Sequence, residues 1–266
     1  MVLLRIVFAL LVVSCTMLAS LSAAILPTGS YYVESSGVVV AEAENFHVRT
    51  GFSATETWKI VPGEEIPADN ANAIANARGG LYIQALSDNG TGGGGPNVTP
   101  TIEYRVNIST VGTYQLYLRW EANGTVAGTI GASDSMFADI VELKDGIGAN
   151  PIADYYEFQQ ALDGDFATSP WDGFGGKEQN VAGPANNPAI WDITTPGIYT
   201  IRLSQREDGS AVDALAFQLS SLAAPTGFGP AESPVAIPEP TSLLLVLPAA
   251  LACIWQRRST RRPVDA

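Results

Sequence analysis

The feature that most constrains the fold is a pair of alternating segments in the middle of the chain. Apolar side chains occupy every second position, first at Ile102, Tyr104, Val106 and Ile108, and then at Tyr114, Leu116, Leu118 and Trp120. Val111-Gly112-Thr113 lies between the two segments and has the composition of a turn. Because side chains alternate across a β-strand, the pattern predicts two half-buried strands that form a hairpin-like unit.

Similar short segments fill most of the chain between residues 38 and 219. They are joined by turns rich in Gly, Pro and Asn, and no helical pattern of ordinary length lies outside the two ends. The further strands we expect are residues 38–44, 57–61, 81–86, 136–143, 155–159, 198–203 and 212–219. Short strands joined by turns predict an all-β sandwich or barrel, built as one domain over residues 25–222.

Three carboxylates mark the first and the last of these strands. Glu42 and Glu44 are two residues apart and therefore point the same way, and Asp213 shares one face of its strand with Leu215 and Phe217. A buried, unpaired charge is costly, and three carboxylates repel one another unless a cation lies between them. Calcium takes oxygen ligands, so we expect a calcium site here. The alternative is that Glu42 faces solvent and Asp213 caps a turn.

Charge and residue content exclude several functions. The chain has 27 acidic and 14 basic residues, and its acidic body is unsuited to nucleic acid or to an anionic membrane surface. Cys15 and Cys253 both lie in apolar terminal segments, so the body has no disulfide and no cysteine metal site. No nucleophile is indicated beside the single histidine, His47, and no spacing marks a pair of glycosidase carboxylates. We expect the chain not to be an enzyme.

The N-terminal segment, residues 1–24, has the pattern of a secretory signal peptide. One positive charge, Arg5, precedes an apolar run that ends in small residues at Ala24, where we expect cleavage. Alternatively, Val12-Val13-Ser14-Cys15 resembles the lipobox of bacterial lipoproteins, in which Cys15 becomes the lipidated first residue. Both interpretations predict export.

The C-terminal segment combines a Pro-rich linker, 223–236, with an apolar run, 242–255, and four arginines. A helix over the apolar run would be about 21 Å long, shorter than the ~30 Å hydrocarbon core. Together with Pro238-Glu239-Pro240, this order resembles a PEP-CTERM sorting signal over residues 237–262. That resemblance implies a transient membrane anchor whose tail an exosortase-type enzyme removes. An ordinary single-span anchor is the alternative, and both place the body outside the cytoplasm.

Several segments of the body resemble, in order, the galactose-binding-like jelly rolls of carbohydrate-binding module families 6 and 35. They are residues 41–46, 102–106, 112–120, 196–203 and 208–217, and the resemblance covers roughly residues 38–219. The chain is also similar to a related C-terminal domain of some plant-cell-wall glucuronidases. The resemblance implies an all-β jelly-roll sandwich, here flanked by a signal helix and a short C-terminal apolar helix.

The family resemblance also implies roles for single residues. In those families the matching carboxylates, here Glu42, Glu44 and Asp213, hold a structural calcium. Sugar is bound by aromatic faces at one end of the sandwich, since the face of an aromatic ring is negative and suits the C–H groups of a sugar. The candidates are Trp171, Trp191 and Tyr82, with Ser210 at a position near the last strand where the family often has Asn. For Trp171 and Trp191 the alternative is that each packs in the core.

Two functions follow from this reading. The first is non-catalytic binding of a polysaccharide or other glycan at the bacterial cell surface or in exopolysaccharide, with a structural calcium. The second is a surface or matrix protein that keeps the jelly roll without sugar binding and serves adhesion. Exposed aromatic side chains at one end of the sandwich would favour the first, whereas burial of Trp171 and Trp191 would favour the second.

Overall fold

The computed structural model describes the greater part of residues 25–237. The described ranges are 25–51, 56–71, 73–89, 100–122, 135–143, 155–159, 165–168, 170–175, 177–178 and 187–237. The predicted signal peptide and all but the first residue of the predicted sorting signal lie outside them. Within these ranges no helix is long and apolar enough to cross a membrane.

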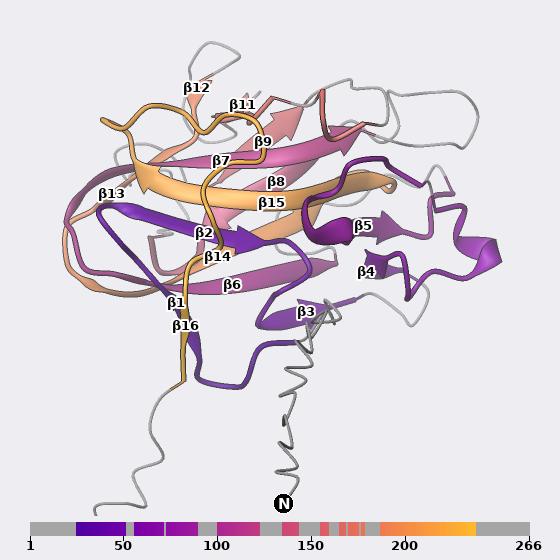
Figure 1. The fold of residues 1–266 in the computed structure, drawn as a ribbon, viewed down its shortest axis with the longest axis horizontal. Coiled ribbons are helices and arrows are strands. Elements are labelled where there is room, and N and C mark those ends of the chain that lie inside the picture. The colour runs from indigo at the N-terminus through magenta and orange to yellow at the C-terminus, as the bar shows by residue number, and fades with distance from the viewer. Residues whose placement is uncertain are drawn as a thin grey trace, which may run out of the picture.

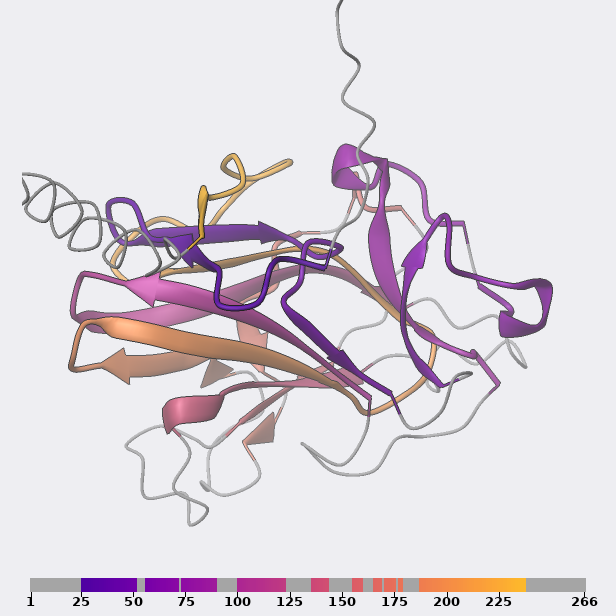
Figure 2. The same cartoon turned by 90° about the horizontal axis from the view of Figure 1, so that it is seen from below.

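The described residues form two β-sheets that pack face to face (Figures 1 and 2). The first sheet contains β1 (Tyr31–Val33), β3 (Val48–Thr50), β6 (Thr101–Ile108), β8 (Ser135–Ile140), β9 (Tyr156–Gln159), β11 (Lys177–Glu178), β14 (Gly197–Gln205) and β16 (Val235–Ala236). The second contains β2 (Val38–Glu42), β4 (Thr57–Val61), β5 (Tyr82–Leu86), β7 (Gly112–Ala122), β13 (Ile190–Ile193) and β15 (Ser210–Leu219). A small ribbon pairs β10 (Phe174–Gly175) with β12 (Asn187–Pro188), and three short 3-10 turns complete the described elements: η1 (Pro67–Asp69), η2 (Arg78–Gly80) and η5 (Val141–Leu143).

The chain crosses repeatedly from one sheet to the other. It passes from β6 in the first sheet to β7 in the second, and later from β13 in the second to β14 in the first and back to β15. The longest neighbours, β6 with β14 and β7 with β15, are antiparallel. This arrangement confirms the predicted all-β jelly-roll sandwich.

The alternating segments of β6 and β7 build the core, although not as a hairpin. All eight apolar side chains predicted to face inward are fully buried in the main core. The expected hairpin-like pairing is wrong, because β6 pairs with β14 and β7 with β15, and the two strands face each other from opposite sheets. A period of two shows which side of a strand is buried but not which strand lies beside it.

An irregularity in β15 changes which side chains share a face. The register against β7 shifts between Val212 and Ala214. As a result Val212, Leu215 and Phe217 lie in the main core, while Ala214 packs in a separate cluster. Asp213 lies at the shift and pairs with an arginine of β7, so our expectation that it shares a face with Leu215 and Phe217 is wrong. A β-bulge inserts one residue and reverses the alternation beyond it.

Residues 223–236, which we expected to form a linker, lie against the sandwich, and we call them the C-terminal strap. Its last residues form β16, which pairs with β1. Ser233 and Val40 of β2 exchange two hydrogen bonds, of 2.9 and 3.0 Å. Figure 1 shows the strap, in orange and yellow, passing over β15 and β2. The strap is therefore part of the folded surface.

Candidate functional site on the outer face of the second sheet

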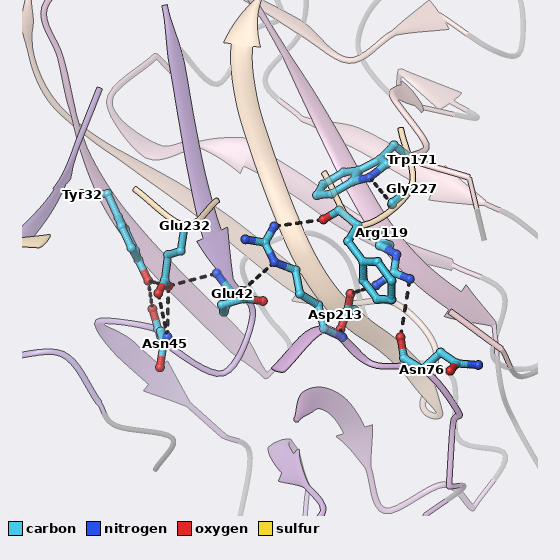
Figure 3. A network of polar contacts seen from close by, with 11 residues as sticks. Tyr32, Glu42, Asn45, Asn76, Arg119, Trp171, Asp213, Gly227 and Glu232 are labelled. Carbon is cyan, nitrogen blue, oxygen red and sulfur yellow. Dashed lines mark hydrogen bonds and ion pairs between the residues drawn. The ribbon is translucent and has the colours of Figure 1, made fainter. Parts of the chain in front are cut away.

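Arg119 of β7 organises a network of buried charges on the outer face of the second sheet (Figure 3). Its guanidinium pairs with Asp213 and donates hydrogen bonds to the backbone carbonyls of Phe166 and Asn76. The ring of Phe166 lies 5.7 Å from the guanidinium carbon and that of Phe228, on the strap, 4.8 Å. Cation–π contacts of this kind stabilise a guanidinium that burial has removed from solvent. The burial of Arg119 is therefore compensated by one carboxylate, two carbonyls and two rings.

Arg78 of η2 links this network to β2 and to the strap. Its Nε lies 2.7 Å from Glu42 Oε1, and its backbone N–H donates to Asp213 Oδ1 at 2.6 Å. Its Nη1 donates to the carbonyl of Phe228 at 3.1 Å. Arg78 and Arg119 together therefore supply a positive charge for each of Glu42 and Asp213.

Glu44 has no such compensation. Its side chain is 1% exposed, and neither carboxylate oxygen has a hydrogen-bond partner in the described part of the chain beyond its own backbone. Burial raises the pKa of Glu44 to about 8, and the charges of Glu42, Asp213 and Glu232 add to the rise. A buried carboxylate without donors is costly unless it is protonated or meets a cation.

The other two predicted calcium ligands differ from each other. Burial raises the pKa of Glu42 to about 7 against the opposing charge of Arg78, and its Oε2 has no partner among the described residues. Burial also raises the pKa of Asp213, to about 6, but both its oxygens accept hydrogen bonds, from Arg78 and Arg119. In the described ranges no three His, Cys, Asp or Glu side chains are arranged as a metal site. The unpartnered oxygens of Glu42 and Glu44 nevertheless suit a hard cation such as calcium.

Glu232 brings a further carboxylate to this corner from the strap. Its Oε1 accepts hydrogen bonds from the Tyr32 hydroxyl at 2.9 Å, the Glu42 backbone N–H at 3.1 Å and the Asn45 amide at 3.0 Å. Figure 3 shows Glu232 between Tyr32, Asn45 and Glu42. These hydrogen bonds join the strap to the end of β2.

The four predicted sugar-binding residues are buried, and the three aromatic ones belong to three separate clusters. Trp191, 1% exposed, lies in the main core against Tyr156, with ring centroids 4.8 Å apart. Tyr82 is buried in a second cluster, and Ser210 is buried and donates a hydrogen bond to the carbonyl of Ser135. The structure therefore does not bring these residues together as one site.

Trp171 is the predicted aromatic residue on the outer face. It is 8% exposed, and its indole N–H donates to the Gly227 carbonyl of the strap at 3.1 Å. Gly229 lies so close to the ring that an added Cβ would come 2.4 Å from it, and the backbone φ of +75° there also favours glycine. The strap therefore covers the face of Trp171.

Sequence reasoning missed the residues that organise this region. Arg119 alternates with apolar residues in its strand, a pattern that predicts the solvent side, where Arg is usually found. Phe228 and Glu232 lie in a Pro-rich segment without a periodic pattern. The paired acids of β2 gave the one usable signal, because Glu42 and Glu44 imply compensating charges nearby.

Comparisons with known proteins give likenesses to solved structures. No protein-family model matches the chain, and no curated protein does. The chain is similar to a GH26-CBM35 β-(1,4)-mannanase of Podospora anserina, with 15% identity and a TM-score of 0.37 over 72% of this chain. It is similar to a family 35 carbohydrate-binding module from Clostridium thermocellum, with 17% identity and a TM-score of 0.38 over 70% of this chain. A family 6 carbohydrate-binding module matches 68% of this chain, with 14% identity and a TM-score of 0.29. The matches cover 100% of the Clostridium thermocellum chain, 93% of the family 6 module and 29% of the mannanase.

Proposed function

We propose that this chain is a non-catalytic carbohydrate-binding protein. The observation that carries the proposal is an exposed aromatic ring that packs on a buried guanidinium. Phe228 is 56% exposed, its ring lies over the Arg119 guanidinium, and its own backbone carbonyl accepts a hydrogen bond from Arg78. An exposed aromatic face offers a sugar ring a surface on which to stack.

Calcium is the second part of the proposal. Glu42 and Glu44 would be its ligands, because they hold buried oxygens without partners in the described ranges. Asp213 would hold Arg119 and Arg78 in place beside the ion, since its oxygens are occupied by them. A bound calcium would neutralise the corner where β2 ends and so stabilise the sandwich.

We further propose that the protein acts outside the cytoplasm. The signal-peptide pattern of residues 1–24 supports export to the cell envelope or extracellular matrix. The pattern of residues 237–262 supports at least transient membrane anchoring and processing by an exosortase-type enzyme.

A second function, adhesion or matrix assembly without sugar binding, is favoured by one observation. Trp171, Trp191, Tyr82 and Ser210 are all buried. A sandwich that uses these aromatic residues for its own packing has none of them available to stack on a sugar.

A glycan array separates the two functions. The full chain is applied with calcium and again with a chelator, beside the variants Phe228→Ala and Phe174→Ala. Phe174 is the matched control, because it is also an exposed aromatic residue but lies on the β10–β12 ribbon. We expect Phe228→Ala to weaken glycan binding at least tenfold, about 1.4 kcal/mol, and Phe174→Ala to leave it unchanged. Failure of the folded wild-type chain to bind any glycan would reject carbohydrate binding and leave the adhesion function.

A further inference from the structure

Four carboxylates gather where the end of β2, the bulge of β15 and the C-terminal strap meet. Glu42 and Asp213 each have an arginine partner. Glu44 and Glu232 have none among the residues that the structure describes, since the groups that donate to Glu232 are a hydroxyl, an amide and a backbone N–H. With all four carboxylates ionised, as a bound cation would require, the corner carries two negative charges in excess, which is the charge that one divalent cation neutralises.

Glu232 is close enough for its charge to interact with a cation bound at this corner. Its Oε1 accepts a hydrogen bond from the backbone of Glu42 at 3.1 Å. The Asn45 amide donates to both of its carboxylate oxygens, at 3.0 and 3.2 Å, and so holds the Glu232 carboxylate beside the end of β2. Glu44 is 99% buried with both oxygens unpartnered in the described ranges, so an ion that enters the corner finds ligands already in place.

The same charge opposes docking of the strap when the cation is absent. Glu232 must then approach the carboxyl groups of Glu42 and Glu44, and it is repelled by each of them to the extent that the group is ionised. The hydrogen bonds that the neutral side chains of Tyr32 and Asn45 donate to Glu232 favour docking. A cation at Glu44 converts this repulsion into attraction, so it favours the docked strap.

We propose that a divalent cation bound at Glu42 and Glu44 docks the C-terminal strap through the charge of Glu232. This inference rests on the calcium site proposed above and adds a partner and a consequence to it. By linkage, an ion that binds the docked state more tightly stabilises docking by the same free energy. The strap is thus expected to be tightly held with calcium and loosely held without it.

Docking of the strap sets how far the folded domain extends from the C-terminal tail. The strap leads directly into the segment with the sorting pattern. When docked, the chain leaves the domain from β16, beside β1. When released, residues 223–236 would act as a tether with a root-mean-square length of about 20 Å. Calcium would therefore control the reach of the domain from its anchor.

Hydrogen exchange and calorimetry on the full chain test this inference. Backbone exchange is followed by mass spectrometry in calcium and in chelator, and calcium affinity is measured by titration calorimetry with calcium chloride. We expect calcium to slow exchange of the β2 and strap amides, among them Val40, Glu42 and Ser233, at least tenfold. Exchange in β6 and β14 reports whether each variant is folded.

Glu232→Gln is the decisive variant, because glutamine keeps an acceptor for Tyr32 and Asn45 but removes the charge. We expect it to bind calcium about tenfold more weakly and to keep the strap protected with or without calcium. Glu142→Gln is the matched control, since Glu142 is an exposed carboxylate bonded to Thr200 on the first sheet. It should behave as the wild type does.

Three results would overturn the inference. If the wild type binds calcium and strap exchange does not change, the coupling is absent although the calcium site stands. If Glu232→Gln binds calcium as the wild type does, Glu232 is not a charge partner. If the wild type gives no heat with calcium, both the site and the coupling are rejected, while sugar binding on the array is judged separately.

Discussion

Two buried glutamates in this molecule differ in how many hydrogen-bond donors surround their carboxylates. Glu34, 7% exposed, follows β1, and its carboxylate lies against the turn between β6 and β7. It accepts hydrogen bonds from the backbone N–H groups of Gly37, Ser109 and Thr110 at 2.6 to 2.8 Å, and from the hydroxyls of Ser109 and Thr110 at 2.7 and 2.9 Å. Burial raises the pKa of Glu34, but the hydrogen bonds from Ser109 and Thr110 outweigh it and lower the pKa to about 2.

Glu44 lies at the other end of β2 and is at least as buried. It has no donor in the described part of the chain beyond its own backbone, and burial raises its pKa to about 8. The fold surrounds one carboxylate with donors and, among the described residues, gives the other none beyond its own backbone. The difference teaches that burial of a carboxylate does not by itself indicate a binding site, and that the lack of donors is what makes Glu44 a candidate.

The largest expected effect is the loss of the satisfied carboxylate. Glu34→Ala would leave three backbone N–H groups and two hydroxyls of a buried turn without their acceptor. We expect the free energy of unfolding to fall by about 3–5 kcal/mol, measured by urea denaturation. A loss below about 1 kcal/mol would mean that water or a neighbouring group replaces the carboxylate, and the comparison would fail.

The second-largest effect is the response of stability to calcium, which should differ between variants of the two glutamates. At one hundred times its dissociation constant, calcium is expected to raise the free energy of unfolding of the wild type by about 2.7 kcal/mol. Glu44→Gln should lose this increment, because glutamine lacks the charge that binds the ion. Glu34→Gln should keep the increment although it starts from a lower stability. Equal calcium responses in wild type and Glu44→Gln would move the site away from Glu44.

The pH dependence of stability in chelator should have opposite signs at the two positions. The folded-state pKa of Glu34 is lowered, so its contribution is present above its ordinary value of 4.5 and is lost as the pH falls toward 2. The folded-state pKa of Glu44 is raised, so its penalty is absent below 4.5 and grows as the pH rises toward 8.

Glu44→Gln isolates the second slope. Between pH 5.5 and pH 8 we expect the variant to become more stable than the calcium-free wild type by about 2 kcal/mol, less than the full linkage of ~1.36 kcal/mol per unit because a buried site relaxes. Urea denaturation at several pH values measures the difference. A difference that does not vary with pH would show that Glu44 is ionised in the folded protein.

The sequence predicted the parts of this molecule that depend on local pattern. Alternation identified β6 and β7 and their buried faces, and the spacing of Glu42 and Glu44 identified the acidic corner. Long-range pairing escaped it, because β6 and β7 share a core without sharing a sheet. The bulge in β15 also escaped it, since nothing in the local pattern marks the extra residue.

The strap escaped prediction for a different reason. Its contacts join residues about two hundred positions apart, as between Glu232 and Tyr32, and a Pro-rich composition suggests a linker. The burial of Arg119 also escaped prediction, because alternation cannot show that a second layer covers the outer face of a sheet. Both are effects of tertiary contact, which local propensity does not contain.

The smallest expected effect comes from a third glutamate. It tests whether burial or charge pairing determines how much stability is lost when a carboxylate is removed. Glu64 forms an ion pair with Arg49 and accepts a hydrogen bond from the Ile60 N–H at 2.9 Å, but both side chains of the pair are partly exposed. Burial raises the pKa of Glu64, but the hydrogen bonds from Arg49 and the Ile60 N–H and the charges of Arg49 and Lys59 together outweigh burial and lower it. Because water screens the pair, Glu64→Gln should lower the free energy of unfolding by only about 0.5 kcal/mol, and the difference should shrink in 1 M salt. A loss as large as that of Glu34→Ala would mean that charge pairing, rather than burial with saturated hydrogen bonding, sets the cost of removing a carboxylate from this sandwich.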